Sequence, residues 1–201
     1  MRIGVIGAGQ LGATLAEWCA QSGHDVAVTS RHPERLTGLA ERLGSHGAVM
    51  PVADAAAYAD AVLFAPGWDT AHEAIDLAAD GLAGKVVIDA TNPPAPGPDG
   101  RSGLETLIGW APEAHWVKAF NTLPTAVLAR RRGHDPLLAE FVCTSLPDAR
   151  ATASQLIRDL GFAPFYAGGD EAARLTETGG PLQLSEVDVA DATDFLARAL
   201  A

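Results

Sequence analysis

Residues 2–12 read RIGVIGAGQLG, and this stretch decides the fold. Residues 2–7 are a short run, rich in β-branched side chains and ending in glycine, which is typical of a buried strand. In the residues that follow, Leu11, Leu15 and Cys19 recur every four positions and so share one face of a helix. The stretch therefore predicts a strand, a tight turn and a helix.

Three glycines in this turn complete the pattern G-x-G-x-x-G. Gly7 permits the tight turn, Gly9 lets a diphosphate approach the backbone, and Gly12 lets the helix pack closely on the strand. The free amides and the positive end of the helix would then hold the diphosphate. The alternative is a glycine-rich connector that binds nothing. The strand before the turn and the helix after it favour a dinucleotide site made by Gly7, Gly9, Gln10, Leu11 and Gly12.

The alternation of strand and helix continues along the chain. The expected strands are residues 2–7, 25–29, 48–52, 61–65, 85–90, 115–120, 140–145 and 162–167, with helices near 33–43, 70–79 and 148–160. Strands separated by helices imply a parallel sheet covered on both faces. We therefore predict an α/β fold. A single Rossmann-type, doubly wound, mainly parallel sheet occupies residues 1–168, and a small C-terminal helical extension occupies residues 169–201.

Composition sets limits on partners and location. Fourteen Lys and Arg against 25 Asp and Glu give a net charge of −11, which argues against general binding of nucleic acid or anionic lipid. No apolar stretch reaches the roughly 18 residues of a membrane span, and the N-terminus enters a strand at once. We therefore expect a cytoplasmic protein with no membrane partner. Cys19 and Cys143 lie far apart in apolar runs, so we expect buried thiols and no metal site.

The residues after the second strand indicate which dinucleotide binds. NAD-preferring domains place an acid there to accept a hydrogen bond from the ribose 2′-hydroxyl. Here the sequence is Thr29-Ser30-Arg31, with Arg35 one helical turn further on, while Asp25 stands at the start of the strand and so at the wrong edge of the sheet. Hydroxyls and guanidinium groups bind a 2′-phosphate. The sequence therefore predicts NADP(H), bound through Thr29, Ser30, Arg31 and Arg35.

Residues 91–103 read as an extended loop. The segment holds four prolines and three glycines and almost no apolar side chains. Loops of this length are either functional or surface connectors, so a lid over a site and a plain connector both remain open.

Four stretches of the chain resemble one family. The opening residues 3–31, VVIDATNP at 86–93, WVKAFNT at 116–122 and GFAPFYAGGDEAARLTE at 161–177 are similar to the coenzyme F420-dependent NADP oxidoreductases. The resemblance spans nearly the whole chain. It implies that NADP(H) is held against a deazaflavin and that hydride passes directly between the two rings.

The resemblance also implies roles for residues beyond the first turn. It places Ala65, Pro66 and Trp68 beside the nicotinamide half of NADP(H) and residues 119–122 along the pocket for the second ring. Asn92 and Asn121 follow predicted strand ends, where they contact a ligand or cap a loop. The remaining cofactor-binding residues expected on this basis are Asn92 and Ala119; the substrate-binding residues are Pro93, Phe120, Asn121 and Thr122.

Hydride exchange between stacked heterocycles needs proximity and no side-chain acid or base. We therefore name no catalytic residue. A rival hypothesis gives Lys118 and Asn121 the role of a Lys-x-x-Asn pair, as in the β-hydroxyacid dehydrogenases, although period-two alternation would point Lys118 and Phe120 to one face and Asn121 to the other. Two further alternatives are an NADPH-dependent reductase of a flavin, quinone or small carbonyl compound, and a non-catalytic NADP(H) sensor. The expected partners are a small redox co-substrate and a second copy of the chain in a homodimer.

Overall fold

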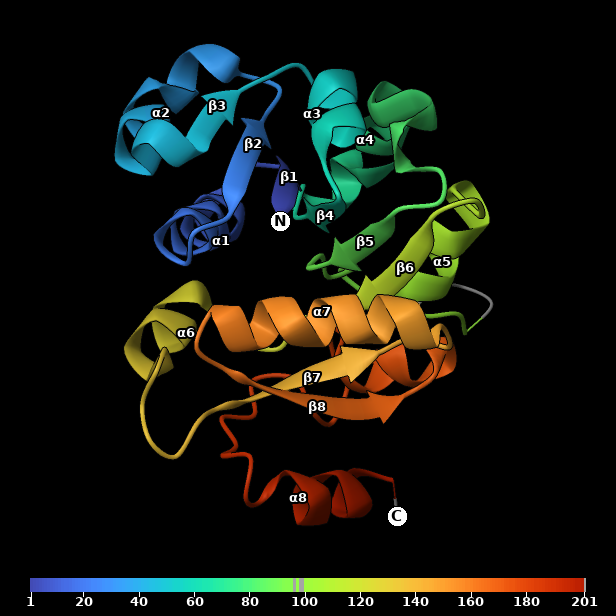
Figure 1. Ribbon diagram of the computed structural model, residues 1–201. Coiled ribbons are helices and arrows are strands. Elements are labelled where there is room, and N and C mark those ends of the chain that lie inside the picture. The colour runs from blue at the N-terminus through green and yellow to red at the C-terminus, as the bar shows by residue number, and fades with distance from the viewer. Residues whose placement is uncertain (96, 98–99, 201) are drawn as a thin grey trace.

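The computed structural model describes residues 1–95, 97 and 100–200, and within them one eight-stranded sheet forms the centre of the molecule (Figure 1). Its order is β3-β2-β1-β4-β5-β6-β7-β8. Neighbouring strands are parallel except β6 and β7, which are antiparallel. The bounds are β1 Arg2–Ile6, β2 Asp25–Thr29, β3 Gly47–Val49, β4 Ala61–Phe64, β5 Val86–Asp89, β6 His115–Lys118, β7 Ala139–Cys143 and β8 Ala163–Gly168. The predicted α/β, Rossmann-type sheet is confirmed.

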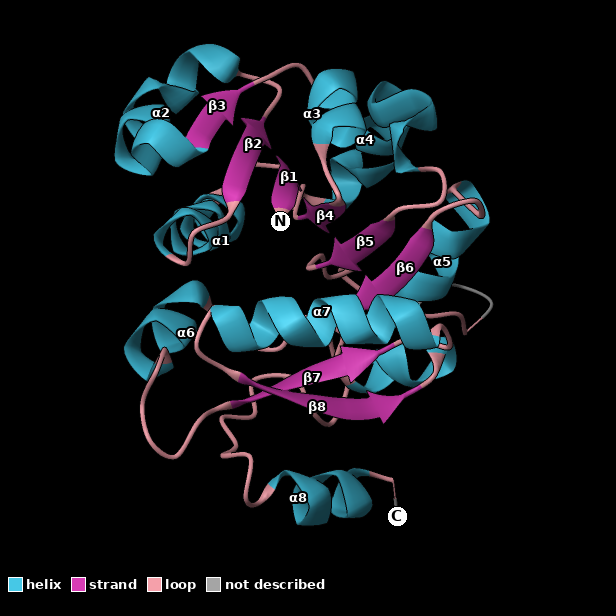
Figure 2. Ribbon diagram, viewed as in Figure 1, coloured by secondary structure: helices cyan, strands magenta, loops and turns pink. Residues whose placement is uncertain are grey.

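Helices cover both faces of this sheet (Figure 2). One face carries α1 Gln10–Gln21, α2 Thr37–Leu43, α6 Thr125–Arg131 and α7 Pro147–Asp159. The other carries α3 Val52–Tyr58, α4 Ala71–Ala78 and α5 Gly103–Trp110, and α8 Ala192–Ala199 packs beyond β7 and β8. Short 3-10 helices precede α2 at Pro33–Leu36 and α4 at Trp68–Thr70, and another, η5, spans Asp170–Leu175. The strand order reverses direction between β1 and β4, so a crevice is expected at their carboxyl ends.

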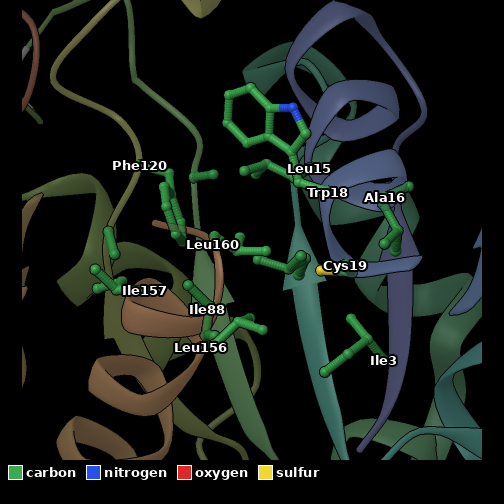
Figure 3. Close-up of a cluster of buried hydrophobic side chains, with 14 of the residues drawn as sticks. Ile3, Leu15, Ala16, Trp18, Cys19, Ile88, Phe120, Leu156, Ile157 and Leu160 are labelled. Carbon is green, nitrogen blue, oxygen red and sulfur yellow. The ribbon is translucent and has the colours of Figure 1, made fainter. Parts of the chain in front are cut away.

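The larger core cluster joins the two halves of the chain. Leu15 and Cys19 of α1, Leu156 of α7 and Leu160 at the C-cap of α7 are fully buried in the same cluster on one face of the sheet (Figure 3). Burial of each such leucine contributes about 1.5–3 kcal/mol. Cys19 and Cys143 are buried and unpaired, as expected, and burial raises the pKa of each thiol to about 12. Within the described residues, no helix combines the length and the apolar character needed to cross a bilayer.

Most predicted boundaries differ by one to three residues from those of the structure. The strand expected over residues 48–52 is β3 at Gly47–Val49, and Val52 instead opens α3 directly after Pro51. Alanine is the strongest helix former, and the alanines between Val52 and Tyr58 favour a helix there. The loop expected over residues 91–103 ends at Ser102, whose side chain and that of Glu105 form a capping box for α5. Its residues 96, 98 and 99 lie outside the described structure, so the choice between lid and connector stays a prediction.

The chain turns sharply after β6. Phe120 has φ 63°, in the left-handed region, which non-glycine residues rarely adopt. The strand alternation therefore stops at Lys118, and Phe120 joins Val117 and Ala119 in one core cluster, where its ring packs against Phe162 at 6.3 Å between centroids. The expectation that Lys118 and Phe120 share a face was wrong for this reason.

Candidate functional site

A cleft of about 330 Å³ lies at the carboxyl ends of β1, β2 and β4, where the strand order reverses. One wall comes from the turn after β1, a second from the residues after β2, and a third from the residues after β4 together with α4. The lining residues are Ile6, Gly7, Ala8, Gly9, Thr29, Ser30, Arg31, His32, Arg35, Leu36, Val52, Ala65, Pro66, Gly67, Thr70, Glu73, Ala74 and Leu77. The cleft thus gathers segments that are up to 71 positions apart in sequence, from Ile6 to Leu77.

Each glycine of the first turn meets a different constraint. Gly7 has φ 96°, donates its N–H to the carbonyl of Thr29 at 3.1 Å, and leaves no room for a Cβ against Ala65 and Pro66. A Cβ at Gly12 would collide with the carbonyl oxygen of Gly7. At Gly9, in contrast, a Cβ would meet no protein atom within 4 Å. Gly9 therefore faces open space that a ligand can fill, whereas Gly7 and Gly12 are required by the protein's own packing.

That open space adjoins the N-terminus of α1. Gly9 caps this helix and offers no side-chain acceptor to the first-turn amides. Such amides, together with the positive end of a twelve-residue helix, bind an anionic group. The open space and these amides therefore suit a diphosphate.

The variant Gly9→Ala is expected to fold normally and to lose nucleotide affinity. Gly9 has φ −69°, which alanine adopts freely, so the added methyl group affects only the space in front of the turn. We expect binding of NADPH to weaken by at least about tenfold, or about 1.4 kcal/mol, when measured by calorimetry. Gly12→Ala is the matched comparison, because its overlap with Gly7 costs stability of about 1–3 kcal/mol in a thermal melt. Unchanged affinity in Gly9→Ala would contradict the assignment of this turn.

The wall after β2 is basic. Arg31 and Arg35 line the cleft with exposed side chains, and neither makes an ion pair within the described residues. Ser30 also lines it, and its hydroxyl accepts a hydrogen bond from the His32 amide at 3.0 Å. Asp25 lies at the opposite end of β2, where it pairs with His46 at 3.2 Å. The wall therefore presents two guanidinium groups and no carboxylate at the position that distinguishes NADP from NAD.

The other expected cofactor residues divide into two groups. Ala65 and Pro66 line the cleft, as the resemblance implied. Trp68 lies just outside its wall and packs against Trp110 at 5.7 Å between ring centroids. Gln10, Leu11, Asn92 and Ala119 do not line it either, and Gly12 is packed beneath the turn. Several lining residues were missed, although Thr70, Glu73, Ala74 and Leu77 have the helical spacing that identifies one face of the helix after the fourth strand.

Asn92 and Asn121 bind each other. The Asn92 amide donates to the carbonyl of Asn121 at 2.6 Å, and the Asn121 amide donates to the side-chain oxygen of Asn92 at 3.0 Å and to the carbonyl of Thr176 at 2.9 Å. These bonds join the ends of β5 and β6 to the C-terminal segment. The pair therefore cross-links three segments at the carboxyl edge of the sheet.

Close to this cross-link in sequence lies a buried ion cluster. The Lys118 ammonium contacts Asp89 at 2.8 Å and Glu177 at 2.9 Å, and Glu177 also accepts the amides of Gly103 and Leu104 at the start of α5. Burial by itself would lower the pKa of Lys118, but the two carboxylates outweigh it and hold that pKa above its usual value. Because Lys118 is wholly buried and charged in this cluster, it presents no atom to a substrate, which removes the geometric support for the Lys-x-x-Asn hypothesis.

The residues expected around a second ring are mostly inaccessible. Ala119 and Phe120 are fully buried, because the left-handed turn directs the Phe120 ring into the core, and Asn121 and Thr122 are 5% and 2% exposed. The expectation that Phe120 lines a substrate pocket was wrong. Pro93 instead lines a second hollow of about 350 Å³, together with Ser102 of the α5 cap and residues 174, 175 and 177–181. No periodicity or motif spacing predicted that the C-terminal segment contributes to this edge. Among the described residues, no group of three or more His, Cys, Asp or Glu is placed to hold a metal ion.

Comparison with known proteins agrees with this geometry. The model of a family described as NADP oxidoreductase, coenzyme F420-dependent, matches residues 2–93. The crystal structure of the hypothetical protein SMa0349 from Sinorhizobium meliloti is 30% identical, with a TM-score of 0.80, over 94% of this chain and 95% of that one. Residues 2–93, the nucleotide-binding part of the chain, belong to the coenzyme F420-dependent NADP oxidoreductase family.

Two further relatives show the breadth of this NADP oxidoreductase family. The structure of a candidate F420-dependent NADP reductase from Arthrobacter sp. FB24 is 28% identical, with a TM-score of 0.74, over 86% of each chain. Metalloreductase STEAP3 of Rattus norvegicus is 30% identical over 180 residues, which are 88% of this chain. The chain spans only 36% of the length of that relative. The matches therefore agree on an NADP-dependent oxidoreductase, while the proteins they name differ in what they reduce.

Proposed function

We propose that this protein transfers hydride directly between NADP(H) and a planar acceptor of the deazaflavin type, coenzyme F420 or a close analogue. The observation that carries the proposal is the open space in front of Gly9 at the reversal of strand order, beside Arg31 and Arg35, which have no ion-pair partner in the part of the chain that the structure describes. A diphosphate fits the first feature and a 2′-phosphate the second.

Different residues of the cleft would bind different parts of the cofactor. The turn at Gly9 and the start of α1 bind the diphosphate, Ser30, Arg31 and Arg35 bind the 2′-phosphate, and Ala65 and Pro66 contact the nicotinamide half. Bound NADP(H) supplies the hydride donor or acceptor. The chain then has to orient the two rings to within about 3–3.5 Å and to exclude water, and needs no proton from a side chain.

The choice of a deazaflavin rests on the family match and on the Arthrobacter relative. We place this acceptor at the second hollow, whose Pro93 follows β5 next along the same sheet edge. The rival acceptors are a flavin, a quinone or a small carbonyl compound. Binding without turnover would instead indicate an NADP(H) sensor.

Mixing the protein, NADPH and oxidised coenzyme F420 tests the proposal. We expect the absorbance of NADPH and that of oxidised F420 to fall together, with one equivalent of each consumed. Turnover with FMN, a quinone or a carbonyl compound, but none with F420, would replace the acceptor and keep the cofactor. Tight binding of NADPH with no turnover of any acceptor would favour the sensor.

Arg31→Ala is expected to discriminate between the two nicotinamide cofactors. Loss of a hydrogen bond to a charged group costs about 1.5–3 kcal/mol, so NADPH should bind about 10- to 150-fold more weakly. Affinity for NADH, which lacks the 2′-phosphate, should be nearly unchanged. Equal losses for both cofactors, measured by titration, would show that Arg31 does not contact the 2′-phosphate.

A further inference from the structure

Glu73 is the one acid among the described residues that line the cleft, and it lies on the wall formed by α4. Glu73 lies in the first turn of α4 and lines the cleft together with Ala74 and Leu77 of the same helix. It is exposed and makes no hydrogen bond or ion pair within the described residues. Asp76 of the same helix does not line the cleft and faces His72 at 3.5 Å. The acid that faces the cleft is therefore the unpartnered one.

A carboxylate in this position conflicts with a pure phosphate site. NADP carries negative charge at its diphosphate and at its 2′-phosphate, so an acid in the same cleft lowers affinity unless it meets a hydrogen-bond donor. With the diphosphate assigned to Gly9, the 2′-phosphate to Arg31 and the nicotinamide half to Ala65 and Pro66, the α4 wall is the part of the cleft left for the base. The 6-amino group of adenine carries two N–H donors and lies away from the phosphates, so a carboxylate can accept a hydrogen bond from it.

The apolar residues beside Glu73 support the same ligand group. Leu77 is 48% exposed although it is large and apolar, and it follows Glu73 by four positions, so the two side chains are neighbours on the helix surface. Ala74 lies between them in the cleft wall. A flat aromatic ring laid on Leu77 and Ala74 covers this apolar surface and brings its edge to Glu73.

We infer that α4 recognises the adenine base: Leu77 and Ala74 contact its face, and Glu73 accepts a hydrogen bond from its 6-amino group. The inference rests on the proposed NADP(H) site and adds a residue that selects the base. An acid in the first turn of a helix also interacts favourably with the helix dipole. That effect does not depend on where the side chain points, and on its own it predicts no loss of ligand affinity when Glu73 is replaced.

The test uses adenosine 2′,5′-bisphosphate, which carries only the adenine half and needs no acceptor. We expect Glu73→Ala to bind it at least about fivefold more weakly than the wild type in calorimetry, which is the lower part of the range for a hydrogen bond to a charged group at an exposed site. Asp76→Asn removes the same charge from the same helix and is expected to bind it unchanged. With purine riboside 2′,5′-bisphosphate, which lacks the 6-amino group, Glu73→Ala and the wild type should bind equally.

Equal or tighter binding of adenosine 2′,5′-bisphosphate by Glu73→Ala would overturn the inference, because it would mean that Glu73 only repels the phosphates. An equal loss with both bisphosphates would also overturn it, because the lost contact would then lie elsewhere than at the amino group. If the wild type binds neither bisphosphate, the proposed cofactor site is wrong and the inference falls with it. Failure of the F420 assay alone would leave this result untouched.

Discussion

Lys118→Met is expected to lower the free energy of unfolding by about 3–5 kcal/mol, since removing one partner of a buried ion cluster leaves uncompensated charge. Two carboxylates, Asp89 and Glu177, would then remain in the protein interior without the Lys118 ammonium, which has no solvent exposure in the wild type. Chemical denaturation at pH 7 measures the loss. The raised pKa of Lys118 means that its stabilising charge is present throughout the neutral range and is lost only as the pH rises through that pKa.

Two comparison variants separate the buried cluster from the general effect of removing a cation. Arg2→Met breaks an exposed ion pair with Asp60, whose side chains are 52% and 44% exposed, and should cost far less. The double variant Lys118→Met with Glu177→Gln removes one of the stranded carboxylates and should recover part of the loss. A loss in Lys118→Met no larger than that in Arg2→Met would contradict the assignment of the cluster.

Glu140→Gln is expected to stabilise the protein in mildly alkaline solution. Glu140 is fully buried, its Oε1 accepts the Phe120 amide at 2.7 Å, and its Oε2 has no partner within the described residues. Burial raises the pKa of this carboxyl from 4.5 to about 8, and the bond from Phe120 only partly opposes the rise. Glutamine keeps the acceptor for Phe120 and cannot ionise.

The pH dependence has a definite sign. Between pH 4.5 and about 8 the folded protein retains a proton on Glu140 that the unfolded chain releases, so the wild type loses stability as the pH rises through this window. The full loss amounts to about 5 kcal/mol, at about 1.4 kcal/mol per pKa unit. Glu140→Gln and the wild type should therefore be similarly stable near pH 4.5 and diverge toward pH 8. Glu34→Gln, at an exposed residue, is the control, and parallel stability curves for Glu140→Gln and the wild type would contradict the prediction.

The sequence predicted the sheet because its signals are local. Residues 2–12 carry the strand, the turn and the helix start within one continuous stretch, and Ser30, Arg31 and Arg35 follow the second strand directly. Period-two and period-3.6 patterns need no information about the rest of the chain. For this reason Gly7 and Gly9 of the turn and the basic wall of the cleft could be anticipated, although Gln10, Leu11 and Gly12 do not line it.

The residues that could not be predicted depend on contacts between distant positions. Glu140 reads as part of a β-branched strand, and only the fold shows that its carboxyl is buried against Phe120. Phe120 alternates correctly in sequence, but the left-handed turn removes it from the expected face. Glu177 lies 59 positions beyond Lys118, in a tail that reads as an acidic surface, and no periodicity relates the two.

The position of Glu177 also bears on the order in which the chain can be completed during synthesis. β1 can pair with both of its neighbours, β2 and β4, within the first 64 residues, so this part of the sheet can form while the rest is still being made. The second half cannot form completely until residue 177 leaves the ribosome. Before then, Lys118 can pair only with Asp89, and the amides of Gly103 and Leu104 lack the Glu177 carboxylate as their acceptor. A nascent chain would therefore have a folded cleft beside an unpaired sheet edge. Chaperones protect intermediates of this kind.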